Sequence, residues 1–374
     1  MYASWNTRSF GFLVSSLVLF LSSLASSAGR DVSEVVENAG IERYKWKYET
    51  LGHRLLRMEE HISALADTSK IRFFDRRYEL LDWIISNGVA KIESLQLDAD
   101  YKARKEAIVT LETIDLALKE SGVLICIPTV TMSEGLTTKR LSEFNCKKYR
   151  YARNGQLRSF YGVDCDIGAF LYLSIGEVLQ LPLSMMELPN HNFIRWQLNQ
   201  IQHINWDNNS ALIFNDDELQ LGLSSTDGVT LTTRAERSSR FPLKMDEQEV
   251  VGYYCTIIAD MLRKQGRYRE AIVHYEKAIE IRPNSTFAMN NLSWMYLTVA
   301  ELECEENHHK ALQLSERVDR ISPSNKTNKD TYSCACAAVG DFEKAIKVEK
   351  LAFNKDYKIE GFKKGLTCLE LGEE

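Results

Sequence analysis

A cysteine, a histidine and an aspartate follow one another, in that order, within residues 161–208. Cys165 stands at the start of a helical pattern, His191 begins a strand-like segment, and Asp207 ends the next one. A histidine that touches both a thiol and an orienting carboxylate can take the thiol proton and turn the sulfur into a nucleophile. The order of these residues therefore predicts a Cys-His-Asp site for nucleophilic catalysis.

Several short elements must position these side chains. Apolar residues recur at helical spacing over residues 165–181, so we expect a helix there, and the positive end of its dipole would favour a Cys165 thiolate. The β-rich segments that follow predict strands over residues 183–188, 191–198 and 201–206. A hairpin of this length would bring Asp207 beside His191.

The local sequence carries the pattern DCD-GA-LYL-IGE-L-LPL---E-P-HNF-RW, followed by NWD. This pattern resembles the core of the transglutaminase-like superfamily, as found in bacterial exported proteins that also carry tetratricopeptide repeats. The resemblance covers roughly residues 155–207. It implies an α+β core in which a helix packs on an antiparallel sheet. It also implies Cys165 as nucleophile, His191 as general base and acid, and Asp207 as the orienting group.

The same resemblance implies an oxyanion hole. One donor would be the backbone N–H near the cysteine, and Gln156 and Tyr161 are the candidates for the second donor. Removing one such donor costs about 10²–10³ in rate in other enzymes, so the identity of this donor affects efficiency.

Metal binding is an alternative for two other groups of residues. Asp164 and Asp166 flank the cysteine, and some members of the superfamily hold calcium nearby, but two carboxylates cannot supply the roughly six to eight oxygens that calcium takes. Cys304, His308 and His309 have near-helical spacing but lack a fourth ligand. We therefore expect no cofactor, with calcium as the remaining alternative.

The composition is that of a soluble globular protein with roughly two or three domains. The chain has 374 residues, of which 44% are hydrophobic and 26% charged, and its formal net charge is −6. This charge, without a long basic segment, argues against a general nucleic-acid-binding protein.

The N-terminus differs from the rest of the chain. Residues 10–25 are almost all apolar or small, and Ser26 and Ala28 provide small residues for a cleavage site. We therefore predict a secretory signal peptide over residues 1–28, with an uncleaved membrane anchor over residues 10–25 as the alternative. In both cases the body of the protein would be exported, to the periplasm, to the medium or to the membrane surface.

Two further regions surround the central segment. Residues 31–121 lack proline and show helical apolar spacing, so they are predicted to form a helical segment in front of the core. The core itself would occupy residues 122–240, beginning with the β-rich sequence VLICIPTVTM at residues 123–132. Its polar end could serve as a lid over the site or as a linker.

The C-terminal third shows an internal repeat. From about residue 246, small and aromatic residues recur with a period of about 34 residues. Gly266, Ala271 and Tyr275 belong to the first repeat, and Gly340 and Ala345 belong to the third, because the second repeat carries an insertion around residues 302–308. This pattern resembles the tetratricopeptide repeat (TPR). Residues 246–374 are therefore predicted to form an all-α TPR solenoid of about three repeats and a final helix over residues 359–371. Its concave face would bind a peptide or protein partner.

The chain has eight cysteines, which an exported protein could pair, but the sequence assigns no pairing. Cys334 and Cys336 have the C-x-C spacing of a metal pair. On a helix they would point apart, and Cys336 falls at a core position, so we interpret it as a packing residue.

These patterns predict an exported transglutaminase-like cysteine hydrolase, of peptidase or amidase type, whose repeats bind a protein partner or substrate. Acyl transfer to an amine would use the same residues. The alternative is a catalytically inactive core that serves as a scaffold for TPR-mediated protein interaction.

Overall fold

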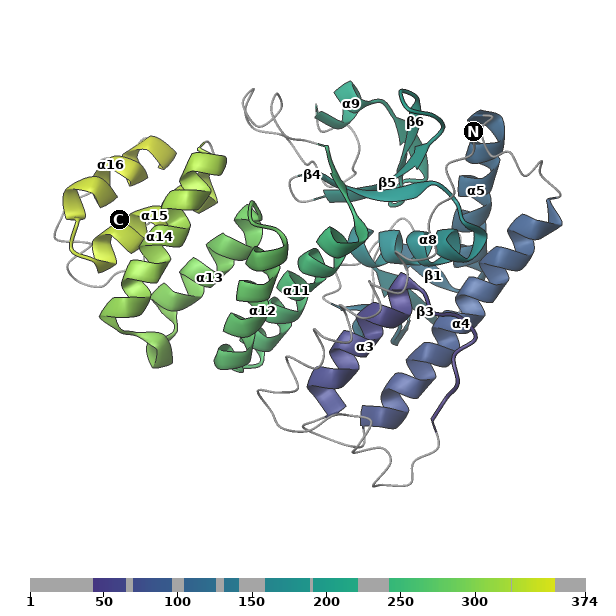
Figure 1. Cartoon of the computed structure of the whole chain (residues 1–374), viewed down its shortest axis with the longest axis horizontal. Coiled ribbons are helices and arrows are strands. Elements are labelled where there is room, and N and C mark those ends of the chain that lie inside the picture. Colours follow the sequence, from purple (N-terminus) through teal and green to yellow (C-terminus); the bar gives the residue numbers. More distant parts are fainter. Residues whose placement is uncertain are drawn as a thin grey trace, which may run out of the picture. The chain divides into compact units, whose positions relative to one another are not determined.

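The computed structural model describes residues 43–64, 70–95, 104–125, 131–140, 159–188, 191–220, 242–323 and 325–353 (Figure 1). The chain divides into two compact units, Met1–Pro182 and Leu183–Glu374. The signal segment expected over residues 1–28, the oxyanion candidate Gln156 and the final helix expected over residues 359–371 lie outside the described residues. None of the helices in the described part is long and apolar enough to cross a membrane.

The first unit is mainly helical. Its helices are α3 (Leu51–Ala64), α4 (Lys70–Ser94), α5 (Arg104–Glu120), the single turn α6 (Met132–Gly135) and α8 (Cys165–Leu179). Helix α4 buries one face through residues three and four apart, among them Phe74, Tyr78, Leu81 and Ile85. Helix α3 packs on α4, and both pack on α8. The N-terminal helical region expected from the sequence is therefore present.

A three-stranded sheet completes the first unit. Its strands are β1 (Val123–Ile125), β2 (Thr138–Arg140) and β3 (Ser159–Val163). Strand β3 lies in the middle, parallel to β1 and antiparallel to β2. The first residues of the β-rich sequence at 123–132 form strand β1, and residues 126–130 lie outside the described residues. At its other end Met132 begins α6 instead, because Thr131 caps that turn by accepting a hydrogen bond from the Glu134 N–H.

The second unit begins with a five-stranded antiparallel sheet (Figure 1). Its strands are β4 (Leu183–Leu188), β5 (His191–Gln197), β6 (His203–Asp207), β7 (Leu212–Phe214) and β8 (Leu243–Met245), in the order β7-β6-β5-β4-β8. The first two strands match the predicted ones closely. Strand β6 starts later than expected, because the Asn199 side chain accepts hydrogen bonds from the Ile201 and Gln202 N–H groups and so extends the turn.

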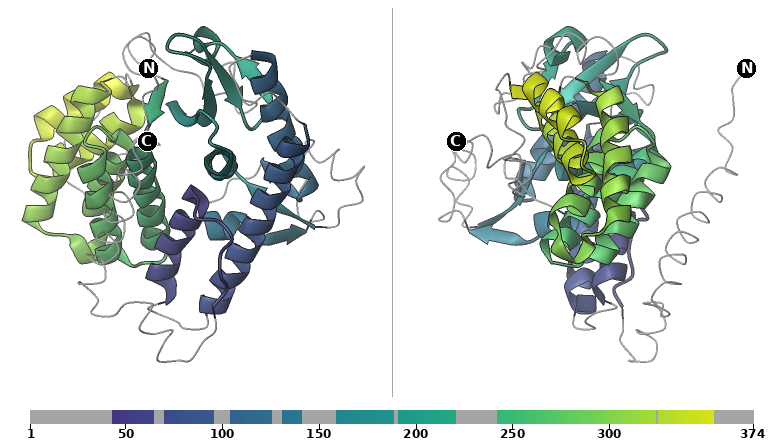
Figure 2. Two further views of the ribbon diagram at one scale, coloured as in Figure 1. Left: turned by 45° about the vertical axis from the view of Figure 1, so that its right-hand side comes forward. Right: turned by 90° about the vertical axis from the view of Figure 1, so that its left-hand side faces the viewer.

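Helical hairpins follow the sheet (Figure 2). They comprise α11 (Glu247–Lys264) with α12 (Tyr268–Ile281), α13 (Thr286–Thr298) with α14 (Glu305–Ile321), and α15 (Lys326–Ala338) with α16 (Phe342–Phe353). A five-residue helix, α9 (Asp216–Gln220), follows strand β7. A 3₁₀ turn (Ala300–Leu302) lies between α13 and α14. The C-terminal region is therefore helical, as predicted.

Equivalent contacts occur within different hairpins. The Ser293 hydroxyl donates to the Ala311 carbonyl at 2.9 Å, and the Ser333 hydroxyl makes the same contact with the Ala345 carbonyl at 2.9 Å. Gly266 and Gly340 both adopt positive φ angles, of 74° and 86°, where the first helix of a hairpin ends. The later hairpins therefore repeat features of the first one and of each other.

The C-x-C pair lies on α15. Cys336 is a free, fully buried thiol that packs with Tyr332, Ala345 and Val348, which confirms its role in the core. Cys334 is disulfide-bonded. The two sulfurs therefore do not act together as metal ligands.

Candidate functional site

His191 and Asp207 come together in the second unit. Strands β5 and β6 pair with Ile194 opposite Trp206, so Asp207 lies opposite Phe193 and on the same face of the sheet as His191. His191 Nε2 lies 3.3 Å from Asp207 Oδ1, and the two side chains are 2% and 0% exposed. The structure thus places an aspartate beside the imidazole in a water-excluded position.

The turn after β6 fixes the carboxylate of Asp207. Its Oδ1 accepts a hydrogen bond from the Asn209 N–H at 3.0 Å, and its Oδ2 accepts one from the Ser210 hydroxyl at 2.8 Å. This is the local bonding by which an aspartate stabilises a turn. The turn therefore holds the carboxylate in place independently of the histidine.

The two ring nitrogens of His191 have different surroundings. Nε2 is buried close to Asp207 but is not aligned for a hydrogen bond with it, so the contact is one of charge proximity. Within the described part of the second unit, no hydrogen-bond partner faces Nδ1. An imidazole with a carboxylate at one nitrogen and an uncommitted second nitrogen can act as a proton acceptor.

Cys165 belongs to the first unit, where it is the first residue of α8. Asp164 caps this helix, since its Oδ1 accepts the Ile167 N–H at 3.0 Å. The Cys165 thiol is half-buried and not in a disulfide, and it donates to Asp166 Oδ1 at 3.4 Å. The helix N-terminus favours a thiolate, whereas the two flanking carboxylates favour the neutral thiol. Because Cys165 lies in one unit and the His191–Asp207 pair in the other, the three-residue site as a whole stays a prediction.

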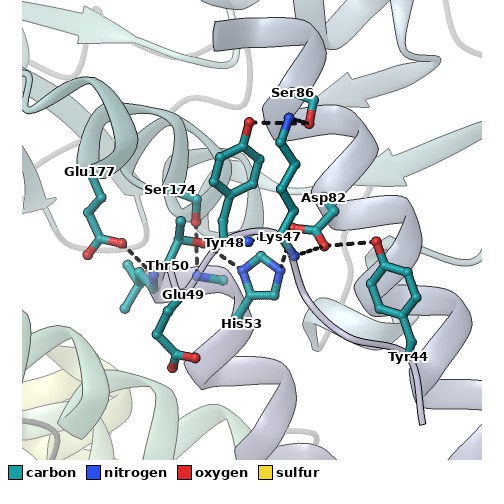
Figure 3. A network of polar contacts seen from close by, with 12 residues as sticks. Tyr44, Lys47, Tyr48, Glu49, Thr50, His53, Asp82, Ser86, Ser174 and Glu177 are labelled. Carbon is teal, nitrogen blue, oxygen red and sulfur yellow. Dashed lines mark hydrogen bonds and ion pairs between the residues drawn. The ribbon is translucent and has the colours of Figure 1, made fainter. Parts of the chain in front are cut away.

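The far end of α8 is attached to the N-terminus of α3 (Figure 3). Glu177 Oε2 accepts the Leu51 N–H at 2.6 Å, and the Ser174 hydroxyl accepts the Gly52 N–H at 2.9 Å. Arg54 adds an ion pair with Glu177 at 2.7 Å. A carboxylate is favourable at a helix N-terminus because it satisfies free N–H groups and the helix dipole. These bonds fix the axis of the helix that carries Cys165.

A second buried histidine lies beside this attachment (Figure 3). Thr50 Oγ1 lies 2.9 Å from His53 Nδ1, and Asp82 Oδ1 lies 3.2 Å from His53 Nε2. Burial is the main cause that lowers the pKa of His53 to about 4, and it outweighs the opposing effect of Asp82. Spacing along the sequence does not reveal this pair, because Asp82 comes from the neighbouring helix α4.

Other candidates from the sequence occupy structural positions. The Tyr161 N–H donates to the Gly122 carbonyl at 2.8 Å, so this backbone donor is already used next to the β1–β3 pair. His203 Nε2 lies 3.3 Å from Asp216, in a cluster where Asp216 also accepts from Arg195 and Asn205. Among the described residues, no group of three or more His, Cys, Asp or Glu side chains is arranged to hold a metal ion.

The first helical hairpin has the packing of a known repeat. Ala259, Ala271, Tyr275 and Ala278 are fully buried between α11 and α12, and Gly266 forms the turn. Residues 254–285 match the tetratricopeptide repeat family model. A TPR repeat implies protein partners. A comparison with curated proteins finds no match.

Proposed function

We propose that the chain is an exported transglutaminase-like cysteine hydrolase whose TPR repeats bind a protein partner or substrate. The observation that carries the proposal is the buried His191–Asp207 pair, with the second imidazole nitrogen left uncommitted in its own unit. A cysteine at the first position of a fifteen-residue helix is the matching nucleophile. In this proposal α8 and the antiparallel sheet together form the α+β core.

The proposed reaction is acyl transfer from an amide to water. The Cys165 thiol gives its proton to His191, and the thiolate adds to the amide carbonyl carbon to form a tetrahedral oxyanion. The imidazolium then protonates the leaving amine, and a thioester on Cys165 remains. Water, deprotonated by His191, hydrolyses this thioester and regenerates the thiol. An amine in place of water would give transamidation with the same residues.

The proposed location follows from the N-terminal sequence. Residues 1–28 would serve as a signal peptide, or residues 10–25 as an anchor, and either would export the catalytic and repeat regions. The N-terminal residue of the mature protein, determined after expression of the full chain, distinguishes the two: cleavage near residue 28 supports the signal peptide.

The enzymatic proposal is tested by labelling with a thiol-reactive peptide electrophile. We expect the wild type to label at Cys165 and Cys165→Ala to lose that label. Cys304→Ala is the matched control, because Cys304 is an exposed free thiol in the repeat region. Equal labelling of wild type and Cys165→Ala, under conditions where both are folded, would refute the proposal.

A non-catalytic scaffold is the second candidate function, and the TPR match at residues 254–285 favours it. In that case the core would serve only to carry the repeats. The two candidates separate in one experiment. A scaffold retains its protein partner after Cys165→Ala and shows no Cys165-dependent labelling, whereas a hydrolase shows that labelling.

A further inference from the structure

Four side chains connect the first helical hairpin to the strands β4 and β5. The Asn192 side-chain amide donates to the Tyr253 hydroxyl at 3.0 Å. Arg282 forms an ion pair with Glu187, and its guanidinium lies 5.6 Å from the centre of the Tyr253 ring. We call these four residues the strand clamp. They join two strand residues to two residues of the TPR hairpin.

The strand clamp lies next to His191 in the sequence but on the opposite face of the sheet. Glu187 and Asn192 face each other across the β4–β5 pair, and the next facing pair is Leu188 with His191. Since successive side chains of a strand point to opposite faces, Asn192 points away from the face that carries His191 and Asp207. The clamp therefore contacts the start of β5 on the face opposite the His191 imidazole.

The side chains of the strand clamp are largely buried, so they tolerate few alternative arrangements. Asn192 is 3% exposed, and the side chains of Arg282 and Glu187 are 9% and 18% exposed. Charged and hydrogen-bonded groups in such surroundings are poorly screened, so a wrong arrangement is costly.

A glycine permits the close approach on which the clamp depends. A Cβ atom on Gly252 would lie 2.8 Å from a carbon of Ile281 and 3.0 Å from one of Arg282. Only a residue without a side chain thus lets α11 pass this near the end of α12. As a result Tyr253, the next residue, lies against Arg282.

We infer that Tyr253 is a positioning residue for the His191 imidazole, acting through Asn192. The inference rests on the proposed role of His191 as the general base. The Tyr253 hydroxyl fixes the Asn192 side chain, Asn192 fixes the start of β5, and the strand sets the direction in which His191 points. The first TPR hairpin is then part of the framework of the site as well as a module for protein binding.

The test compares Tyr253→Phe with Tyr275→Phe in the full chain. Both variants remove one hydroxyl from the same hairpin, but the Tyr275 hydroxyl bonds to Asp260 and not to the sheet. We expect Tyr253→Phe to shift the His191 ring resonances in NMR spectra and to slow probe labelling of Cys165 about five- to tenfold. Tyr275→Phe should leave both measurements at wild-type values.

Asn192→Ala examines the same hydrogen bond from the strand side. The double variant with Tyr253→Phe should be little slower than either single variant, because both substitutions remove the same Asn192–Tyr253 hydrogen bond. If Tyr253→Phe moves the His191 resonances no more than Tyr275→Phe does, the inference is wrong. If the resonances move but the wild type shows no Cys165-dependent labelling, the positioning stands and the proposed enzymatic function fails.

Discussion

Each unit contains a buried histidine beside an aspartate, and the two pairs are nearly alike in distance. His53 Nε2 lies 3.2 Å from Asp82, and His191 Nε2 lies 3.3 Å from Asp207. They differ at the other ring nitrogen. Thr50 occupies Nδ1 of the fully buried His53, whereas Nδ1 of His191 has no hydrogen-bond partner within the described part of its unit.

The aspartates differ in the same way. Asp82 accepts hydrogen bonds from the Tyr44 hydroxyl and from the N–H groups of Lys47 and Tyr48, so it ties an extended segment to α4. Apart from its contact with His191, the Asp207 carboxylate accepts side-chain and backbone hydrogen bonds from its own turn, when only the described residues are considered. A histidine–aspartate contact therefore does not by itself indicate catalysis. The second nitrogen of His191, which has no hydrogen-bond partner among the described residues of its unit, and the locally held carboxylate are what favour the site in the second unit.

The largest expected effect of a substitution is on reactivity at His191. His191→Asn should slow labelling of Cys165 by about 10²–10⁴-fold, the usual contribution of a general base. His53→Asn is the matched control and should leave the labelling rate of the folded protein within about twofold, while it lowers the melting temperature. A larger effect on labelling from His53 than from His191 would reverse our assignment of the two pairs.

Asp82→Asn should have the next largest effect, this time on stability. It weakens three hydrogen bonds to a buried carboxylate and removes the charge beside His53, so we expect a loss of about 2–4 kcal/mol in the free energy of unfolding. Urea denaturation measures this loss. Glu49→Gln, which disturbs an exposed ion pair with Arg57, should cost less than about 1 kcal/mol. Similar costs for the two variants would contradict a structural role for Asp82.

The pH dependence of stability should follow His53. Its pKa falls from 6.5 in the unfolded chain to about 4 in the folded protein, so between these values the unfolded state binds the proton more tightly. Stability should therefore decrease as the pH falls from about 6.5 towards 4, by up to about 3 kcal/mol. Thermal melts of the wild type and His53→Gln over this range measure the contribution. A slope that survives the substitution would assign the effect to another group.

The smallest effect should come from Thr50→Val. This change removes the hydroxyl beside His53 Nδ1 while keeping the size and branching of the side chain, so it should cost about 1 kcal/mol of unfolding free energy. Labelling of Cys165 should not change. Slower labelling in this variant would mean that the His53 network also shapes the site around Cys165.

Local patterns predicted the elements of the site well. The helix that starts at Cys165 and the strand that starts at His191 are defined by short-range spacing and caps, which the sequence displays directly. The His191–Asp207 approach follows from one short hairpin. Strand β8, by contrast, has only three residues and forms by pairing with β4, which lies next to it in the sheet but far earlier in the chain, so no local pattern reveals it.

Features that depend on distant segments could not be predicted in this way. The His53–Asp82 pair joins two helices, and the strand clamp joins a sheet to a helical repeat, although neither shows a recognisable motif. Glu177 and Asn192 look like ordinary polar residues of a helix and a strand in the sequence. Their partners become visible only when the chain is folded.

The attachment of α8 to α3 has a consequence for how the protein is made. The first N–H groups of α3 bond to side chains 122 and 126 residues later in the chain. During synthesis, the hydrogen bonds at the first turn of α3 can form only after α8 has been made. Contacts between segments this distant in sequence form slowly. A fragment that stops at residue 121 lacks Glu177 and Ser174, and would present the start of α3 to chaperones and proteases instead of to α8.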